Sequence, residues 1–151
     1  MSPYAEALTE AAARTLEELC FFYVTPDPSD EQRAALVDGT MEVHFHGPLT
    51  GRLAVRLCGG TMRTLATNML GDAEGSLGLQ RDALGELANV ICGNLLPVIG
   101  GREAIYDIGA AQPVPNLPLR GPGPQVEVHL GLEDTGRADL LLYIDEGSTP
   151  A

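Results

Sequence analysis

The sequence predicts an α+β domain with a largely antiparallel sheet and long helices packed on it. Two long stretches carry apolar residues at helical spacing, one near the N-terminus and one in the middle of the chain. Four shorter stretches have strand patterns and pair up across short turns. The resulting order, α-β-β-α-α-β-β-β, does not alternate regularly, and such an order is typical of antiparallel α+β folds.

Length and composition are those of one globular domain. The chain has 151 residues, of which 44% are hydrophobic and 20% charged, so it can bury a substantial core. We expect a single domain over residues 1–146 and a disordered tail over 147–151. The net charge of −12 argues against nucleic-acid or anionic-membrane binding, since both require a positive surface.

Residues 3–24 have the pattern of an amphipathic helix. Its apolar line follows a four-three spacing and comprises Leu8, Ala12, Thr15, Leu19 and Phe22. The stretch TPDPSD (25–30) should end the helix, because proline lacks the backbone N–H and clashes with the preceding turn.

The next stretches predict a β-hairpin and a shorter helix. MEVHFHG (41–47) alternates polar and apolar residues, and GRLAVRLCG (51–59) does so again. The short connection between them, with glycine at each rim, suits a tight turn. Residues 61–71 return to helical spacing, and Gly71 suits the C-terminal cap of that helix.

The second half predicts a long helix over 79–99 and then further strands. Residues 104–109 are expected to form a strand, and five prolines between 113 and 124 predict a loop or a sheet edge. Residues 125–134 and 136–146 predict a closing hairpin whose turn is the DTG sequence.

The cysteines and the N-terminus indicate a cytoplasmic protein. The three cysteines, Cys20, Cys58 and Cys92, are far apart in apolar surroundings, which predicts reduced packing residues and neither a disulfide framework nor a zinc site. Two acidic residues precede the first basic residue, unlike a secretory signal. The apolar runs CFFYV and LLLYI are too short to span a bilayer.

The 79–99 helix has two different faces. A helix advances by about 100° per residue, and this places a core face on one side, comprising Leu84, Leu87, Ile91, Leu95 and Val98. The opposite side carries a polar stripe at the spacing i, i+4, i+7 and i+11, comprising Asp82, Glu86, Asn89 and Gly93, with Pro97 beside it. A mid-helix glycine costs about 1 kcal/mol relative to alanine, but it lets another surface approach closely.

The stripe could be the solvated face of an ordinary amphipathic helix. Such faces are usually rich in lysine, glutamate and arginine. Here no lysine or arginine occurs between Arg81 and Arg102, and the outward residues include Gly93 and Pro97. We therefore regard the stripe as a candidate functional surface.

The histidines offer a different candidate, a metal site. His44 and His46 project from one face of a predicted strand, and His129 could in principle join them as a third ligand. No acidic or cysteine partner stands nearby in the sequence, so we interpret them as histidines on the exposed face of the sheet and expect no metal.

The stripe and its flanks resemble the CheX/CheC-type chemotaxis phosphatases. The similarity rests on Asp82, Glu86 and Asn89 within GELANVICGN, and extends upstream to FHGPLTGRLAVRL and a helix ending in NMLG. Downstream, YDIGAAQPV is similar to the family's strand and its proline-bearing segment, with the proline at Pro113. Only one such motif is present, which resembles the single-site, CheX-like branch. The similarity covers residues 40–144.

This resemblance implies a phosphatase acting on the aspartyl phosphate of a CheY-type receiver domain. Asn89 would orient the attacking water, and Glu86 would pair with the receiver's lysine. Asp82 would lie at the rim or support Glu86, and Gly93 would allow close approach. No cofactor of its own is implied, because the receiver supplies Mg²⁺. The resemblance also implies a possible homodimer. Two alternatives remain: a non-catalytic binding module, and a structural role in the flagellar switch.

Overall fold

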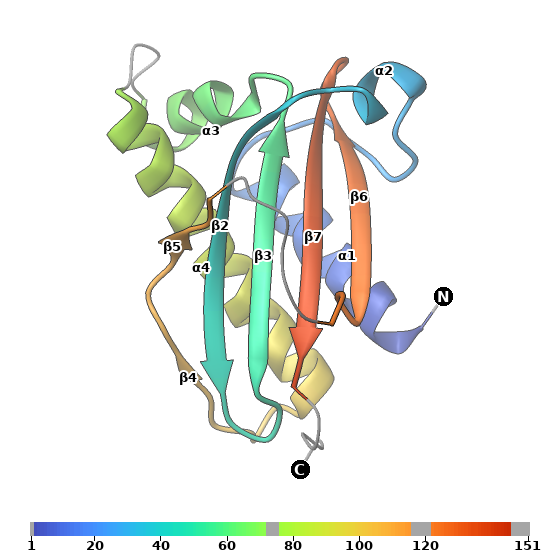
Figure 1. The fold of residues 1–151 in the computed structure, drawn as a ribbon, viewed down its shortest axis with the longest axis vertical. Helices are drawn as coiled ribbons and strands as arrows, with labels where there is room; N and C mark the ends of the chain where they lie inside the picture. Colours follow the sequence, from blue (N-terminus) through green and yellow to red (C-terminus); the bar gives the residue numbers. More distant parts are fainter. Residues whose placement is uncertain (1, 72–75, 116–121, 146–151) are drawn as a thin grey trace.

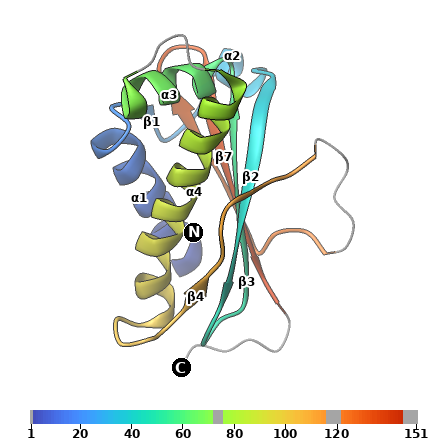
Figure 2. The same cartoon turned by 90° about the vertical axis from the view of Figure 1, so that its left-hand side faces the viewer.

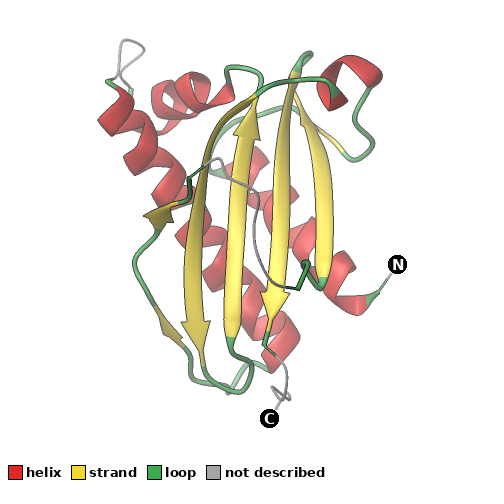
Figure 3. Ribbon diagram, in the orientation of Figure 1, coloured by secondary structure: helices red, strands yellow, loops and turns green. Residues whose placement is uncertain are grey.

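The structure, a computed structural model, describes residues 2–71, 76–115 and 122–145. The predicted α+β class is confirmed (Figures 1 and 3). The helices are α1 (Pro3–Glu18), α2 (Asp30–Arg33), α3 (Thr61–Leu70) and α4 (Leu77–Gly100). The strands are β1 (Val24–Thr25), β2 (Val37–His46), β3 (Gly51–Cys58), β4 (Asp107–Ile108), β5 (Gln112–Pro113), β6 (Val126–Leu132) and β7 (Gly136–Ile144). The predicted tail, 147–151, lies outside the described residues.

The strands form one sheet in the order β1-β6-β7-β3-β2-β4, and β5 also pairs with β2. All the pairs are antiparallel, and the two predicted hairpins are confirmed as β2–β3 and β6–β7. The β6–β7 turn occupies residues 133–135, one residue earlier than predicted. Glu133 takes the left-handed conformation there, with a φ of 54°. Pairing of β3 with β7 joins the hairpins into a continuous sheet.

Helices α1 and α4 cover one face of the sheet (Figure 2). Alternate strand residues point toward them, and the fully buried residues include Leu53, Val55, Leu140 and Leu142 from the strands and Leu87, Ile91 and Leu95 from α4. Each such side chain contributes about 1.5–3 kcal/mol relative to an exposed one. The other face of the sheet carries the intervening residues, many of them polar, and α2 lies at one end of it (Figure 1).

Helix α4 begins two residues before the predicted start and ends one residue after the predicted end. By length and composition alone it could cross a membrane, yet half of its most apolar stretch is buried within the fold. The core therefore accounts for its apolar character. The assignment of Val98 to the core face is wrong, because this residue is 67% exposed. It lies beside a groove whose opposite wall contains the small residues Ala7 and Ala11 of α1, which do not reach over it.

The first helix is shorter than predicted, because α1 ends at Glu18 instead of continuing to residue 24. Phe21 takes a left-handed backbone conformation with a φ of 59°, and the amide of Phe22 donates to the carbonyl of Leu16. Leu19 is consequently 41% exposed. Phe22 is buried, although it lies beyond the end of the helix. The apolar residues keep their helical spacing in the sequence as far as Phe22, but the backbone has already left the helix there.

Two short elements, β1 and α2, were missed in the stretch that the sequence predicted only as a break. Ser29 and Gln32 form a capping box at the start of α2, and this serine–glutamine spacing is a recognisable sequence signal. The strand predicted over 104–109 is confirmed only at Asp107–Ile108. Between β4 and β5, which both pair with β2, Ala111 packs beside α4.

Candidate functional site

The polar stripe lies on the side of α4 that faces away from the sheet. Asp82, Glu86 and Gly93 are exposed, and Asn89 is half-buried. The helix is continuous through all four residues, so they follow one another on a rigid element. The structure therefore brings together the four residues that the spacing predicted.

The two carboxylates of the stripe are unpaired. Within the described ranges, Asp82 and Glu86 make no ion pair and no side-chain hydrogen bond, and the neighbouring Arg81 makes none either. Both carboxylates are therefore available to a cation supplied from outside the chain.

Asn89 has an unmet hydrogen-bonding capacity. Its Oδ1 atom is buried and has no hydrogen-bond partner. One turn earlier, a Cβ on Gly85 would lie 3.4 Å from the Ala111 side chain, so the segment between β4 and β5 covers this side of α4 (Figure 2). An unsatisfied buried acceptor costs about 1–3 kcal/mol, and such a group in a native structure calls for an explanation.

Gly93 has no packing role inside the fold. A Cβ at this position would meet nothing within 4 Å, so a larger residue would fit without a clash. Pro97, one turn later, is also exposed although it lies inside the helix. Gly93 and Pro97 both lower the stability of the helix, and because both are exposed they contribute no packing to the core.

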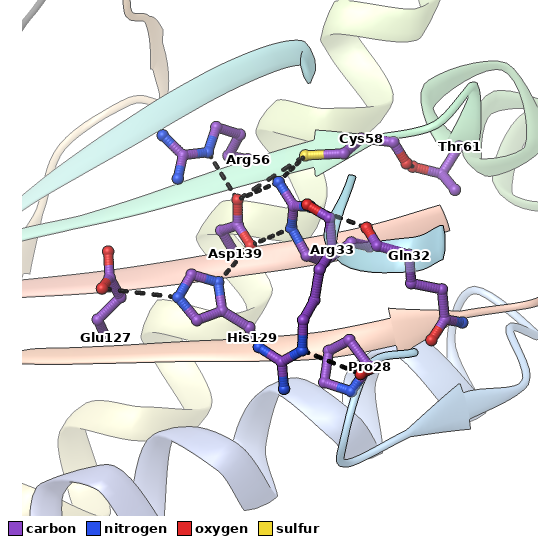
Figure 4. Close-up of polar contacts among 10 residues, drawn as sticks. Pro28, Gln32, Arg33, Arg56, Cys58, Thr61, Glu127, His129 and Asp139 are labelled. Atoms are coloured by element: carbon purple, nitrogen blue, oxygen red, sulfur yellow. Dashed lines mark hydrogen bonds and ion pairs between the residues drawn. The ribbon is translucent and has the colours of Figure 1, made fainter. Parts of the chain in front are cut away.

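A second polar group, which the sequence analysis missed, lies on the opposite face of the sheet (Figure 4). We call it the Asp139 cluster; it comprises Asp139, Arg56, Arg137, His129 and Cys58. Arg56 of β3 and His129 of β6 stand directly opposite Asp139 in the strand register. Strand alternation in GRADLLLYI places Arg137 and Asp139 on one face of the sheet. This alternation was the feature of the sequence from which part of the cluster could have been predicted.

Every charge in the Asp139 cluster is hydrogen-bonded. Asp139 is fully buried and accepts from Arg137 Nε at 2.7 Å, Arg56 Nε at 2.8 Å and His129 Nδ1 at 2.5 Å. Burial raises the pKa of Asp139, but these hydrogen bonds outweigh it and hold the pKa below its ordinary value.

Arg137 also ties α2 to the sheet. Its Nη1 atom donates to the backbone carbonyls of Gln32 at 2.8 Å and Arg33 at 2.6 Å, and its Nη2 atom lies 3.2 Å from Cys58 Sγ. Burial raises the pKa of Cys58 to about 11, which keeps the thiol protonated at neutral pH. The cluster is a structural network in which each charged side chain is hydrogen-bonded to another member.

The histidines do not come together. His44 and His46 are exposed on β2 as predicted, bonded to Glu42 at 3.1 Å and Thr50 at 2.9 Å respectively. His129 lies on β6, with β7 and β3 between it and β2. In the part of the chain that the structure describes, no three His, Cys, Asp or Glu side chains are placed to hold a metal ion.

The cysteines are buried and unpaired, in agreement with the prediction. Burial raises the pKa of Cys20 and of Cys92 to about 12, so neither thiol is a ready nucleophile. Cys92 lies on α4 but on its buried side, away from the stripe. Cys92 is therefore not part of the candidate site, whose functional groups are those of Asp82, Glu86 and Asn89.

Comparison with known proteins identifies the fold and a family model that matches the middle of the chain. A family model described as chemotaxis phosphatase CheX matches residues 40–113, which include the whole stripe. Chemotaxis protein CheX from Vibrio vulnificus superposes with a TM-score of 0.73 at 15% identity, over 95% of this chain and 97% of that chain. No curated protein sequence matches.

Two further solved structures share this fold. One is CheX in a CheX-CheY-BeF3-Mg²⁺ complex from Borrelia burgdorferi, with a TM-score of 0.69 at 16% identity, over 95% of this chain and 98% of that chain. The other is FliY from Thermotoga maritima, with a TM-score of 0.59 at 16% identity, over 92% and 87% of the two chains. These likenesses show that the chain has the fold of these chemotaxis proteins, and over residues 40–113 it matches the chemotaxis phosphatase CheX model.

Proposed function

We propose that this protein is a cytoplasmic phosphatase that hydrolyses the aspartyl phosphate of a CheY-type receiver domain. Water attacks phosphorus, the bond between phosphorus and the aspartyl oxygen breaks, and the products are inorganic phosphate and the free carboxylate. The observation that carries the proposal is the unsatisfied amide of Asn89, one turn from the unpaired carboxylate of Glu86, on a helix that the family model covers.

Asn89 is the catalytic residue of this proposal. Phosphoryl transfer requires little covalent help from the protein, and its rate depends on positioning and on charge stabilisation. A neutral amide can hold a water molecule in line with the phosphorus without adding negative charge beside the phosphoryl group. The buried, unpartnered Oδ1 atom supports this role, because no contact within the chain already uses it.

Glu86 anchors the receiver by pairing with its lysine. Among the described residues no cation pairs with this exposed carboxylate, so docking of the partner would break no ion pair there. Asp82 lies one turn further toward the N-terminus of α4, at the rim of the contact. Gly93 presents no side chain, so the partner's surface can come close to the helix.

The partner brings the metal ion in this proposal. The stripe contains two carboxylates and no histidine or cysteine, and the receiver's own acidic residues would hold Mg²⁺ beside the phosphoryl group. The complex of Borrelia burgdorferi CheX with CheY, BeF3 and Mg²⁺ supports a CheY-type receiver as the partner. The substrate of the present protein would be one receiver domain from its own genome.

The decisive experiment is the decay of acyl phosphate on Mg²⁺-loaded receiver domains, with wild-type protein, Asn89→Ala or no addition. We expect wild-type protein to accelerate the decay, and Asn89→Ala to lose on the order of 10²–10³ in rate, as loss of a preorganised hydrogen-bonding group does. Its affinity for the receiver should change little. The melting temperature should not fall, because Asn89 makes no side-chain hydrogen bond within the described ranges.

A matched control is Asn94→Ala, about 1.4 turns further along α4. Asn94 directs its amide to Thr15 Oγ1 at 3.4 Å and not toward the stripe, so its loss should leave the rate unchanged. Binding without acceleration by the wild-type protein would refute the phosphatase and favour a non-catalytic binding module, in which the stripe is only a docking surface.

A further inference from the structure

A short segment between β4 and β5 runs beside α4 (Figure 2). We call this segment the arch; it comprises Gly109, Ala110 and Ala111. Both flanking strands pair with β2, but only two residues of β2, Val43 and His44, lie opposite the three residues of the arch. The arch therefore has one residue more than the strand beside it, and its last residue packs beside α4.

The geometry of α4 places Asn89 on the side that the arch covers. A Cβ on Gly85 would lie 3.4 Å from Ala111 Cβ, so Gly85 faces the arch. Asn89 lies one turn further along α4 and only about 40° from Gly85 around the helix axis. Asn94, which donates to Thr15 of α1, is about 140° away from Asn89. The buried Oδ1 atom of Asn89 therefore lies toward the arch and away from α1.

The arch is held by few interactions. β4 and β5 are two residues long and exposed, and Pro113 of β5 has no amide hydrogen to donate. Beside these strands, the amide of Gly109 donates to the carbonyl of His44 at 2.9 Å, and that of Val114 to the carbonyl of Thr40 at 3.0 Å. The contact of the arch with Gly85 involves one methyl group, that of alanine. Lifting the arch therefore exposes little apolar surface, and such segments open locally at low cost.

The covered state of Asn89 is unfavourable for the amide itself. With the arch in place, the Oδ1 atom is buried, has no hydrogen-bond partner and is out of reach of a water molecule held by a docked receiver. Lifting the arch exposes this atom, so the open form regains the hydrogen bond that the closed form lacks. Packing of the arch favours the closed form and the unmet acceptor favours the open form. A partner that bonds the amide would shift this balance toward the open form.

We propose that the arch is an autoinhibitory cover, which closes over the Asn89 amide in the free protein and moves off it when a receiver docks on the polar stripe. The inference rests on the proposed function and adds a conformational step to it. Asp82 and Glu86 are exposed while the arch is closed, so the first contact with the receiver needs no opening. Opening then completes the catalytic site only in the presence of the partner.

The test closes the arch with a reversible cross-link. Gly85→Cys combined with Ala111→Cys puts two thiols on Cβ positions 3.4 Å apart, close to the separation of about 3.8 Å in disulfides. The native cysteines are buried and do not compete. With phosphorylated receiver, we expect oxidation to lower kcat by about tenfold or more, and reductant to restore it. The Kd for a receiver that carries Mg²⁺ and beryllofluoride should change by less than about threefold, because Glu86 stays exposed.

The two single substitutions are the matched controls, because each changes one of the same positions but forms no cross-link within the chain. The oxidant should not change the rate of either one. A kcat that is equal in the oxidised and reduced double variant overturns the inference.

Amide hydrogen exchange gives a second readout that does not depend on phosphatase activity. Opening of the arch frees the amide of Gly109 from the carbonyl of His44, so the cross-link should slow its exchange by about tenfold. Equal exchange in the oxidised and reduced forms overturns the inference. If the cross-link slows exchange but neither the reduced nor the wild-type protein accelerates decay, the moving arch stands and the phosphatase proposal falls.

Discussion

The Asp139 cluster and the polar stripe of α4 lie on opposite sides of the sheet and use their polar groups in opposite ways. Asp139 is fully buried, yet it accepts hydrogen bonds from three different cationic or imidazole side chains. Glu86 is exposed and has no partner among the described residues, and the Oδ1 atom of Asn89 is buried without a donor.

The contrast separates polar residues that hold the fold together from those that remain available to a partner. A buried charge is tolerated only when its neighbours satisfy it, so a saturated network such as the Asp139 cluster indicates structure. A half-buried amide with an unmet acceptor reduces the stability of the free protein, so it indicates a role outside the fold. Substitutions on the two sides should therefore change different measurements.

The largest expected effect is on stability, at Asp139. Replacing it by asparagine removes the negative charge between Arg56, Arg137 and His129 and leaves their donors in a buried site. We expect the free energy of unfolding to fall by about 3–5 kcal/mol at pH 7, the range for breaking a buried ion pair. Urea denaturation measures the change. The matched control is Glu42→Gln, which weakens more exposed contacts with Arg52 and His44 on the same face and should cost less than about 1 kcal/mol.

The pH dependence of the same variant follows from the lowered pKa of Asp139. A carboxyl group whose folded-state pKa is depressed stabilises the protein above its unfolded pKa, about 4, and this stabilisation is lost as the pH falls through the folded-state value. The stability difference between wild type and Asp139→Asn should therefore be constant from pH 7 to about pH 5 and shrink below about pH 4. A difference that stays constant down to pH 2 would contradict the ionised Asp139.

An intermediate effect is expected on affinity, at Glu86. Glu86→Ala removes the proposed partner of the receiver's lysine, and because the carboxylate is exposed in the free protein we expect the low end of such losses, about 2 kcal/mol or 30-fold in Kd. The melting temperature should not change. Glu86→Gln, which keeps the size but not the charge, should behave like alanine. A Kd unaffected by both substitutions would remove Glu86 from the contact.

The smallest effect is expected at Asp82. Its exposed position at the rim predicts a change of less than about 1 kcal/mol in affinity for Asp82→Ala, carried mainly by a slower association rate. Stopped-flow association at low and high salt measures it, because screening should abolish the difference between variant and wild type at high ionic strength. A large, salt-independent loss would instead place Asp82 inside the contact.

The α4 stripe was predictable because it depends on one helix. The spacing of Asp82, Glu86, Asn89 and Gly93 fixes their common face once the helix is identified, and the apolar residues on the other side identify it. The β2–β3 and β6–β7 hairpins were predictable for the same reason, since a short turn determines the register of two adjacent strands.

The end of α1 and the Asp139 cluster were not predictable in this way. The apolar spacing of α1 continues through Phe22, and only the left-handed turn at Phe21 shows that the backbone has left the helix. Arg56, His129 and Asp139 come from three strands that become neighbours because β3 pairs with β7 and β7 with β6. Local spacing carries no information about which hairpins pair.

The sequence by itself therefore determined the class of the fold, the two hairpins and the exposed stripe of α4, because each depends on residues close together in the chain. Tertiary structure alone decided which polar groups are satisfied. It placed Asp139 among three donors from other strands, and it left the Asn89 oxygen buried without one beside the segment between β4 and β5. Hydrogen-bond satisfaction is a property of neighbours in space, and those neighbours exist only after the chain has folded.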